Sequence, residues 1–424
     1  MSASDNPSIP ATGPDDARPA ELELMDGTRV APKEQRRRAF AWQLYDVGDS
    51  AFQAIIVTFV FMTYLASDYF IDPAIVALGD EHPEYLRAQA GSQQVISGLD
   101  TIAAVVVAVL APALGRTTDG SGRRKRMLAV FSLITIAVML GMFFVAPEQS
   151  FLLLGAILLA VGIVLSSLAS VNYNAMLSQV ATEKNVGRVS GTGWGMGYLA
   201  SIALLLIALV LFIQDFGLGG GGVLGVPDTQ EGGALDVRFT VLLAAVWFLA
   251  FLIPILRRVP ESPKRDDVPR VGFLQSYREL WRTVKQLWRH DRPLLQFLLA
   301  SAVFRDGLSA VFSWGAVLAA QVYGFSPTEV IYFAVAANLV AGLGTVASGY
   351  LDDRLGPKTV IVGSLIGLLI TGTVLMFTGD GQLTFWVLGL MLCAFVGPVQ
   401  TASRSYLARA VPEGHEGEIF GLYA

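Results

Sequence analysis

Four ionisable side chains lie inside long apolar segments of the sequence: Asp49, Asp100, Arg305 and Asp306. An ionisable side chain in the middle of an apolar helix adds roughly 2.5 to 3.5 kcal/mol to the free energy of inserting that helix into a membrane. Because of this cost, an ionisable residue at such a position is expected to have a function. Arg305 follows Pro293 by 12 residues, and at about 1.5 Å per residue it lies roughly 18 Å along a helix. We therefore expect Arg305 and Asp306 either to bind a charged group or to form a structural ion pair.

A second polar set precedes these residues in the chain. Asp46, Asp49 and Gln53 follow one another at spacings of three and four residues, so on a helix they share one face. Asp46 is close enough to the basic cluster at residues 36–38 to snorkel there, whereas Asp49 lies deeper. Further polar residues within apolar segments are candidates for the same site or for hydrogen bonds between helices: Asn174, Gln400 and Arg404.

The apolar segments that carry these residues are long enough to cross a membrane. The sequence is 53% hydrophobic and only 15% charged, whereas an average soluble domain has about 25% charged residues. Lipid offers no hydrogen-bond partner to the backbone and the alternating pattern of barrel strands is missing, so the segments are expected to be helices. The expected fold class is an all-α polytopic membrane protein. Its ten expected spans are 40–66, 92–114, 127–146, 151–174, 189–213, 238–256, 293–320, 328–350, 359–377 and 383–403.

The distribution of Lys and Arg predicts the orientation of the chain, because cytoplasmic loops collect positive charge. If the N-terminus is cytoplasmic, only Arg87 and Arg238 lie on the outer side. We therefore expect a cytoplasmic N-terminus in a multi-pass protein of the plasma membrane. Residues 1–38 contain scarcely an apolar run and are expected to form a disordered cytoplasmic tail.

The charged segment 257–292 is expected to be a cytoplasmic linker between an N-terminal bundle at 39–256 and a C-terminal bundle at 293–424. From Phe273 onwards its apolar residues recur at steps of three and four, with basic residues between them. This pattern predicts an amphipathic helix. Such a helix could lie in the membrane interface or pack on the cytoplasmic face of the protein.

A polar motif occurs twice, after the second and after the eighth expected span. Residues 115–125 read GRTTDGSGRRK and residues 349–358 read GYLDDRLGPK, so both contain G-x-x-x-D-x-x-G followed by basic residues. The glycines allow close helix packing and tight turns. The Asp can accept hydrogen bonds at the N-terminus of the following helix, or pair with a cation. The motif residues are Gly115, Asp119, Gly122, Arg123 and Arg124 in the first copy, and Gly349, Asp353, Arg354, Gly356 and Lys358 in the second.

The repeated motif resembles the signature of the major facilitator superfamily, in which it gates the cytoplasmic side and does not bind the substrate. Residues 45–52, 187–191 and 397–405 further resemble the vacuole-effluxer-like branch, which is related to fungal vacuolar amino-acid exporters. The resemblance covers nearly all of residues 39–424. It implies two six-helix repeats around a cavity lined by spans one, four, seven and ten, and it implies a weaker gating pair where Gly120 replaces the usual basic residue.

The internal repeat also bears on the end of the chain. Leu177–Gly191 corresponds to Leu407–Gly421, so the sequence stops where an eleventh span would begin. The resemblance implies twelve spans, of which the last two are missing. We expect the natural reading frame to continue by roughly 60 residues that hold two more spans, by analogy with the first repeat.

These features predict a secondary active transporter that moves a small solute by alternating access. Amino acids are the first candidates for the solute, on the resemblance alone. We expect Asp49, Arg305 and Asp306 to form the substrate and coupling centre, with Asp49 carrying a proton and Arg305 binding an anionic group. The alternative is a non-transporting membrane sensor or scaffold with the same fold.

Other classes of protein lack support in the sequence. No nucleophile and base are arranged for catalysis, and no phosphate-binding loop is present, so an enzyme is not expected. The three His residues lie in separate loops and the chain has a single cysteine, Cys393, so no metal site or other cofactor is expected. The expected partners are the solute, a coupling proton and the lipid bilayer, and not a nucleic acid.

Overall fold

The structure is a computed structural model that describes residues 21–214, 221–227, 230, 232–262, 264, 272–378, 381–412 and 414–424. The side chains of residues 310–314, 316–317, 320–321, 327–328 and 331 also lie outside the described part. The tail predicted at residues 1–38 therefore falls partly outside it, because residues 1–20 are not described.

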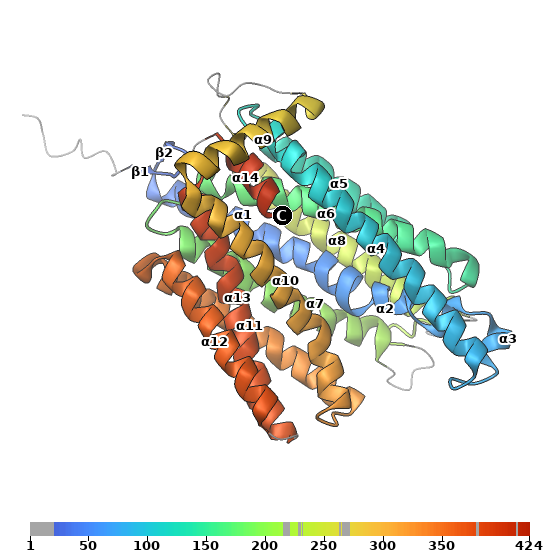
Figure 1. Cartoon of the computed structure of the whole chain (residues 1–424). Coiled ribbons are helices and arrows are strands. Elements are labelled where there is room, and N and C mark those ends of the chain that lie inside the picture. Colours follow the sequence, from blue (N-terminus) through green and yellow to red (C-terminus); the bar gives the residue numbers. More distant parts are fainter. Residues whose placement is uncertain are drawn as a thin grey trace, which may run out of the picture.

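Helices make up almost all of the N-terminal half (Figure 1). The first span, Pro32–Leu65, consists of α1 (Pro32–Ala51), a π-helical segment at Phe52–Phe59, and α2 (Phe61–Leu65). Short 3-10 turns lie at Asp68–Phe70, Gln149–Phe151 and Met176–Gln179, and a second π-helical segment, Leu209–Ile213, ends α7. The helices are α1 (Pro32–Ala51), α2 (Phe61–Leu65), α3 (Pro73–Val76), α4 (Pro83–Thr118), α5 (Arg124–Met142), α6 (Leu152–Ala175), α7 (Val186–Ala208) and α8 (Leu235–Arg258).

The C-terminal half is helical as well. Its helices are α9 (Phe273–His290), α10 (Arg292–Gln321), α11 (Pro327–Leu355), α12 (Pro357–Phe377), α13 (Gln382–Ala410) and α14 (Glu416–Tyr423). Several helices begin with proline, whose missing N–H is no loss in a first turn. Within the described residues, nine helical segments are long and apolar enough to cross a membrane. α10 covers the seventh expected span, and the predicted all-α polytopic architecture is confirmed.

Ordered structure begins before the predicted end of the disordered tail. β1 (Leu22–Glu23) and β2 (Arg29–Val30) form an antiparallel pair, and α1 starts at Pro32. Leu24 is buried, and the N–H of Met25 donates to the carbonyl of Ala181 at 3.0 Å. Residues 21–38 thus differ from the expected tail, because a few apolar side chains and backbone hydrogen bonds hold this hairpin against the loop after α6.

The two halves lie close together at one end of the bundle and spread apart toward the other end (Figure 1). We call the first of these the motif end, because it carries Asp119 and Asp353. There α7 packs against α11 and α13, and α14 packs against α4 and α6. The contacts between the halves are thus concentrated where the repeated motif lies.

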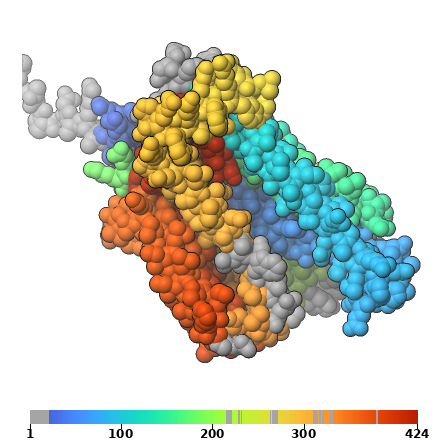
Figure 2. Space-filling model, in the orientation of Figure 1, coloured from blue at the N-terminus to red at the C-terminus, as the bar shows by residue number. Residues whose placement is uncertain are grey.

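α9 lies across the motif end, where it packs against α4 and α10 (Figure 2). The hydroxyl of Tyr277 donates to the carbonyl of Val109 in α4 at 2.8 Å. On another side of α9, Leu274, Trp281 and Trp288 are 84%, 71% and 62% exposed. These three residues are seven positions apart and therefore form one apolar row. The helix packs on the protein and also exposes an apolar row, so its place in the membrane interface stays a prediction.

Candidate functional site

Asp49 lies in α1 next to the π-helical segment, and it contacts α6. Ser166 of α6 donates a hydrogen bond to Oδ1 of Asp49 at 3.2 Å, and Nε2 of Gln53 donates to the hydroxyl of Ser166 at 3.4 Å. Asp49 is half-buried, Ser166 is buried and Gln53 is exposed. π-helical turns are rare and are frequent at functional sites. Asp49 and Gln53 are thus joined through Ser166, on the face that the sequence predicted for them.

Arg404 of α13 reaches across to the N-terminal half, where it forms an ion pair with Asp46 of α1. Its Nη2 lies 3.4 Å from Oδ2 of Asp46, and only 4% and 12% of the two side chains are exposed. The same guanidinium donates to the carbonyl and the hydroxyl of Ser190 at 2.7 and 2.9 Å, and to Oδ1 of Asn174 at 3.4 Å. Asp46 therefore bonds to Arg404 and does not snorkel to the basic cluster at residues 36–38, which corrects that alternative.

Three aromatic rings surround the Arg404 guanidinium. Its Cζ lies 4.7 Å from the ring centroid of Trp42, 5.6 Å from that of Tyr173 and 5.7 Å from that of Trp194. A cation near an aromatic face is attracted by the ring quadrupole, and more strongly when both groups are desolvated. Because all three rings belong to the N-terminal half, these contacts also join the halves.

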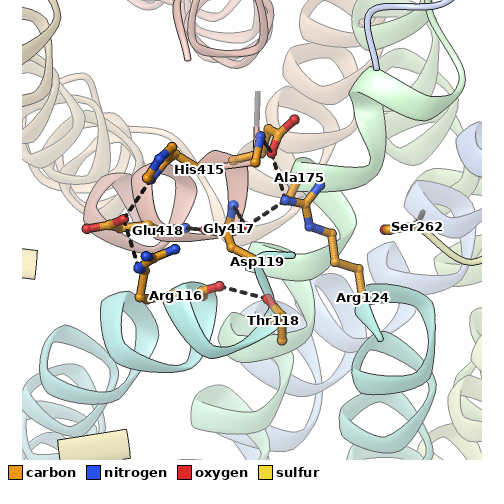
Figure 3. A network of polar contacts seen from close by, with 12 residues as sticks. Arg116, Thr118, Asp119, Arg124, Ala175, Ser262, His415, Gly417 and Glu418 are labelled. Atoms are coloured by element: carbon orange, nitrogen blue, oxygen red, sulfur yellow. Dashed lines mark hydrogen bonds and ion pairs between the residues drawn. The ribbon is translucent and has the colours of Figure 1, made fainter. Parts of the chain in front are cut away.

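The first copy of the repeated motif lies beside α14 (Figure 3). Asp119 accepts hydrogen bonds from the N–H groups of Gly417 and Glu418, both at 2.8 Å. Arg124, in the first turn of α5, lies 2.6 Å from Asp119 and 2.7 Å from Glu416. Asp119 thus stabilises the N-terminus of α14, a helix of the other half, where the macrodipole favours an anion. The sequence left two alternatives for this Asp, hydrogen bonds at the N-terminus of the following helix or pairing with a cation. In the structure Asp119 pairs with the cation Arg124, and the helix N-terminus that it bonds is that of α14.

Electrostatic contacts extend from Asp119 toward His415 (Figure 3). Nε of Arg116 lies 3.5 Å from Oε2 of Glu418, and Nδ1 of His415 lies 3.2 Å from the same oxygen. Burial raises the pKa of Asp119 to about 6, although Arg124 opposes this rise. The hydrogen bond with Glu418 raises the pKa of His415 from its ordinary value of 6.5. The shift of Asp119 accompanies its burial at the contact between the halves, whereas the His415–Glu418 contact lies within the C-terminal half.

Asp353 makes the matching contact in the second copy of the motif. It accepts hydrogen bonds from the N–H groups of Gly187 and Arg188 at 2.8 and 3.1 Å, at the start of α7. Arg409 of α13 lies 3.4 Å from Asp353 and 2.5 Å from Asp352. The cation beside this Asp therefore comes from α13 and not from the motif. Three further basic residues of the two copies are exposed: Arg123, Arg354 and Lys358.

The motif glycines allow the helices to meet at their backbones. A Cβ added to Gly115 would lie 2.0 Å from the carbonyl oxygen of Gly417, and one added to Gly349 would lie 2.8 Å from that of Gly187. Neither helix pair can approach so closely with a larger residue. Two further motif glycines supply the positive φ angles of the turns: Gly122 at 65° and Gly356 at 84°.

Arg305 of α10 contacts α14. Its Nη1 donates to the carbonyl of Tyr423, and its Cζ lies 4.4 Å from the centroid of the Tyr423 ring. Among the described side chains, Arg305 forms no ion pair with Asp306, which is exposed, and neither residue bonds to Asp49. The structure brings together some predicted residues, namely Asp49 with Gln53, and Asp46 with Asn174 and Arg404; Gln400 is half-buried on α13.

Apart from Arg124, which belongs to the motif, sequence reasoning missed the residues that the motif carboxylates contact. The repeat contains a signal for one set of them. Because residues 177–191 correspond to 407–421, Gly187 and Arg188 correspond to Gly417 and Glu418, and each pair supplies the two N–H groups for a motif Asp. The pairing of Arg409 with Asp352 has no counterpart in the motif and could not be predicted from it.

Metal ligands do not gather in the part of the chain that the structure describes. No three His, Cys, Asp or Glu side chains there could hold a metal ion, and Cys393 is buried in α13.

Comparison with known sequences identifies relatives over most of the chain. The model of the family described as vacuole effluxer Atg22 like matches residues 34–424. The uncharacterized MFS-type transporter YxiO of Bacillus subtilis is 26% identical over 386 residues, which cover 90% of this chain and 83% of that protein. Autophagy-related protein 22 of Cryptococcus neoformans is 24% identical over 277 residues, which cover 60% of this chain and 46% of that protein. The chain thus matches less than half the length of this fungal relative.

Solved structures have the same fold. The proton:xylose symporter XylE superposes with a TM-score of 0.64 at 13% identity, covering 92% of this chain and 85% of that one. The human organic anion transporter MFSD10 gives a TM-score of 0.64 at 16% identity, covering 92% and 89%. At these identities the likeness shows the fold alone, which is that of the major facilitator superfamily. Together with the family match, it shows that the chain belongs to the vacuole effluxer Atg22-like family and is a transporter of the major facilitator type.

Proposed function

We propose that the chain is a secondary transporter that moves a small solute across the membrane by alternating access. The observation that supports this proposal is that polar contacts join the halves at the motif end. Asp119 with α14, Asp353 with α7 and Arg404 with Asp46 are all polar contacts between separate helices. Such contacts can break and reform without disrupting the core of either half. The structure then corresponds to a state that is closed at the motif end.

Amino acids are the first candidates for the solute. The family is described as vacuole effluxer Atg22 like, and its fungal relatives are named autophagy-related proteins. Arg305 is the candidate for binding the carboxylate of such a solute. Its guanidinium has five N–H donors in a planar fork, and one of them is used on Tyr423. The remaining donors have no hydrogen-bond partner among the described residues. Binding of a solute carboxylate to this fork would not be reproduced by lysine.

Asp49 is the candidate for the coupling proton. Its carboxylate accepts a hydrogen bond from the buried Ser166, while Gln53, one turn further along, is exposed. The carboxyl group therefore lies at the boundary between the packed interior and the exposed surface of the helix. Opening and closing of the halves would change its hydration, and hydration determines which protonation state is favoured. Asp46 is less suited to this role, because it is already paired with Arg404.

Proton flux in reconstituted vesicles tests this proposal. Vesicles that contain the chain and a trapped pH-sensitive dye are mixed with each of the twenty amino acids in turn. We expect at least one amino acid to drive proton movement, and we expect Asp49→Asn to abolish that movement. Arg305→Lys should instead raise the solute concentration needed for half-maximal flux. Asp80→Asn is the matched control, because Asp80 is an exposed carboxylate outside the spans and makes none of these contacts. Full proton flux in Asp49→Asn vesicles would remove Asp49 from the coupling role.

We also propose that the motif end faces the cytoplasm, with the N-terminus and the 257–292 linker on that side. Cys393 is the only cysteine, so Cys393→Ala gives a background for labelling. Gly225→Cys and Ser262→Cys place single thiols in loops at opposite ends of the expected topology. An impermeant maleimide should label Gly225→Cys in intact cells and Ser262→Cys only after lysis. Labelling of Ser262→Cys from outside would reverse the orientation.

A further inference from the structure

A basic groove lies at the N-terminal end of α1, beside the C-terminal end of α8. It has a volume of about 540 Å³ and is lined by Pro32, Lys33, Arg36, Arg37, Phe40 and Arg258. We use the name basic groove for these six residues. None of them belongs to the Asp119, Asp353 or Arg404 contacts, so the groove is separate from the surfaces where the halves meet.

The basic groove concentrates positive charge without a matching carboxylate. Lys33, Arg36, Arg37 and Arg258 are exposed, and none of them forms an ion pair within the residues that the structure describes. Their neighbour Arg38 differs, because its Nε lies 3.0 Å from Glu34. A concave surface lined by charges of one sign attracts counter-ions more strongly than scattered charges do. The basic groove therefore favours an anionic ligand.

Apolar surface adjoins these charges in the direction of the membrane. Lys33, Arg37, Phe40 and Leu44 follow at steps of four, three and four residues and so form one stripe along α1. Phe40 is 48% exposed although it is large and apolar. On α8, Ile253 lies five residues before Arg258 and is 38% exposed. A ligand that fits this arrangement has an anionic head and an apolar body, which excludes free phosphate as the best occupant.

We propose that the basic groove is a binding site for an anionic phospholipid, with the phosphate between the basic side chains and the acyl chains along Phe40 and the apolar turns of α1 and α8. Basic clusters beside the cytoplasmic end of a spanning helix attract anionic lipids. Arginine supplies paired donors that match phosphate oxygens. The inference rests on the proposed cytoplasmic orientation of the motif end, but it does not depend on the identity of the solute or on Asp49.

Lipid binding to the purified chain tests this inference directly. The chain in neutral detergent is freed of lipid and titrated with dioctanoyl phosphatidylglycerol, and bound lipid is counted by native mass spectrometry. Dioctanoyl phosphatidylcholine tests the need for negative charge, and glycerol 3-phosphate tests the need for acyl chains. We expect one phosphatidylglycerol to bind at least about 10-fold more tightly than either, because each control lacks either the net negative charge or the acyl chains. Equal binding of phosphatidylcholine, or equal binding of glycerol 3-phosphate, would contradict the proposal.

Paired variants locate the site. Each basic residue near an anionic membrane strengthens binding roughly 5-fold, so Arg36→Gln with Arg37→Gln should weaken phosphatidylglycerol binding roughly 25-fold. The matched control removes two exposed basic residues of the same charge outside the basic groove, Arg126→Gln with Lys184→Gln, and should bind normally. Lys33→Gln with Arg258→Gln provides a second test if the first pair does not fold. Normal binding by a folded groove variant, or equal weakening in the control, would overturn the assignment.

Discussion

Asp119 and Asp353 occupy matching places in the two halves, and each accepts two backbone hydrogen bonds from a helix of the opposite half. Asp119 bonds to the first residues of α14 at 2.8 and 2.8 Å, and Asp353 bonds to the first residues of α7 at 2.8 and 3.1 Å. The contacts of these two carboxylates therefore relate the two halves almost symmetrically at the motif end. Both carboxylates lie where a helix dipole favours negative charge, so each of them stabilises the closed arrangement of the halves.

Replacing these carboxylates should open the motif end. Asp119→Asn keeps the size of the side chain but removes its charge and one of its two acceptor oxygens. Hydrogen bonds to charged groups contribute about 1.5 to 3 kcal/mol, so the closed population should fall on the order of 10-fold. Spin labels at the exposed Lys184 and Thr359, in a Cys393→Ala background, report the distance between the halves. Asp80→Asn at the opposite end serves as the control, and an unchanged distance distribution in Asp119→Asn would refute the role of this cap.

Replacing the closely packed motif glycine Gly115 is a second way to open the motif end. In Gly115→Ala the new Cβ would meet the carbonyl of Gly417 at 2.0 Å, so α4 and α14 would have to separate. Overpacking of this kind costs about 1 to 3 kcal/mol, equivalent to roughly a tenfold loss of the closed state. Gly98→Ala lies in the same helix and has nothing within 4 Å of its new Cβ. We expect the spin-label distance to lengthen in Gly115→Ala and not in Gly98→Ala; identical behaviour of the two variants would be evidence against the packing argument.

The stability of the motif end should depend on pH through His415. The hydrogen bond with Glu418 raises the pKa of His415 from 6.5, so its contribution to folding stability is fully present below pH 6.5 and is lost as the pH rises through the elevated pKa. Thermal unfolding in detergent should therefore occur at a lower temperature as the pH rises from about 6 to about 8. In His415→Gln this change should disappear, and its persistence there would assign it to another group.

Arg404 and Asp46 should behave as a coupled pair. Arg404→Gln leaves the carboxylate of Asp46 nearly buried without its cation, which costs about 3 to 5 kcal/mol in comparable cases. Asp46→Asn together with Arg404→Gln removes both charges and should recover part of that loss. Thermal unfolding in detergent measures the two effects. A double variant that is no more stable than Arg404→Gln alone would show that the pair is not coupled.

The sequence predicts the fold well because its strongest signals are local. Long apolar segments require helices in lipid, and the repeated G-x-x-x-D-x-x-G places Asp119 and Asp353 at the ends of two spans, where the structure has them directly after α4 and in the last turn of α11. The sequence also predicts that Asp49 and Gln53 share a face of α1, because helical spacing alone decides it.

Contacts between distant residues are less accessible to sequence reasoning. Arg404 and Asp46 are 358 residues apart, and nothing in either segment indicates that they meet. Asp119 pairs with Arg124 of the following α5, but the backbone N–H groups that it bonds belong to the distant α14, which only the packing of the halves brings to it. The hairpin at residues 22–30 was missed because only a few apolar side chains distinguish it from a solvated tail.

Reciprocal distance changes at the two ends of the bundle test the central claim most directly. The chain in lipid nanodiscs carries spin labels at Lys184 and Thr359 for the motif end, or at Leu78 and Leu383 for the opposite end, all in exposed positions. Asp119→Asn with Asp353→Asn removes both caps. Alternating access predicts that the motif-end distance lengthens while the opposite-end distance shortens in the same sample. A longer motif-end distance with an unchanged or longer distance at the opposite end would contradict it.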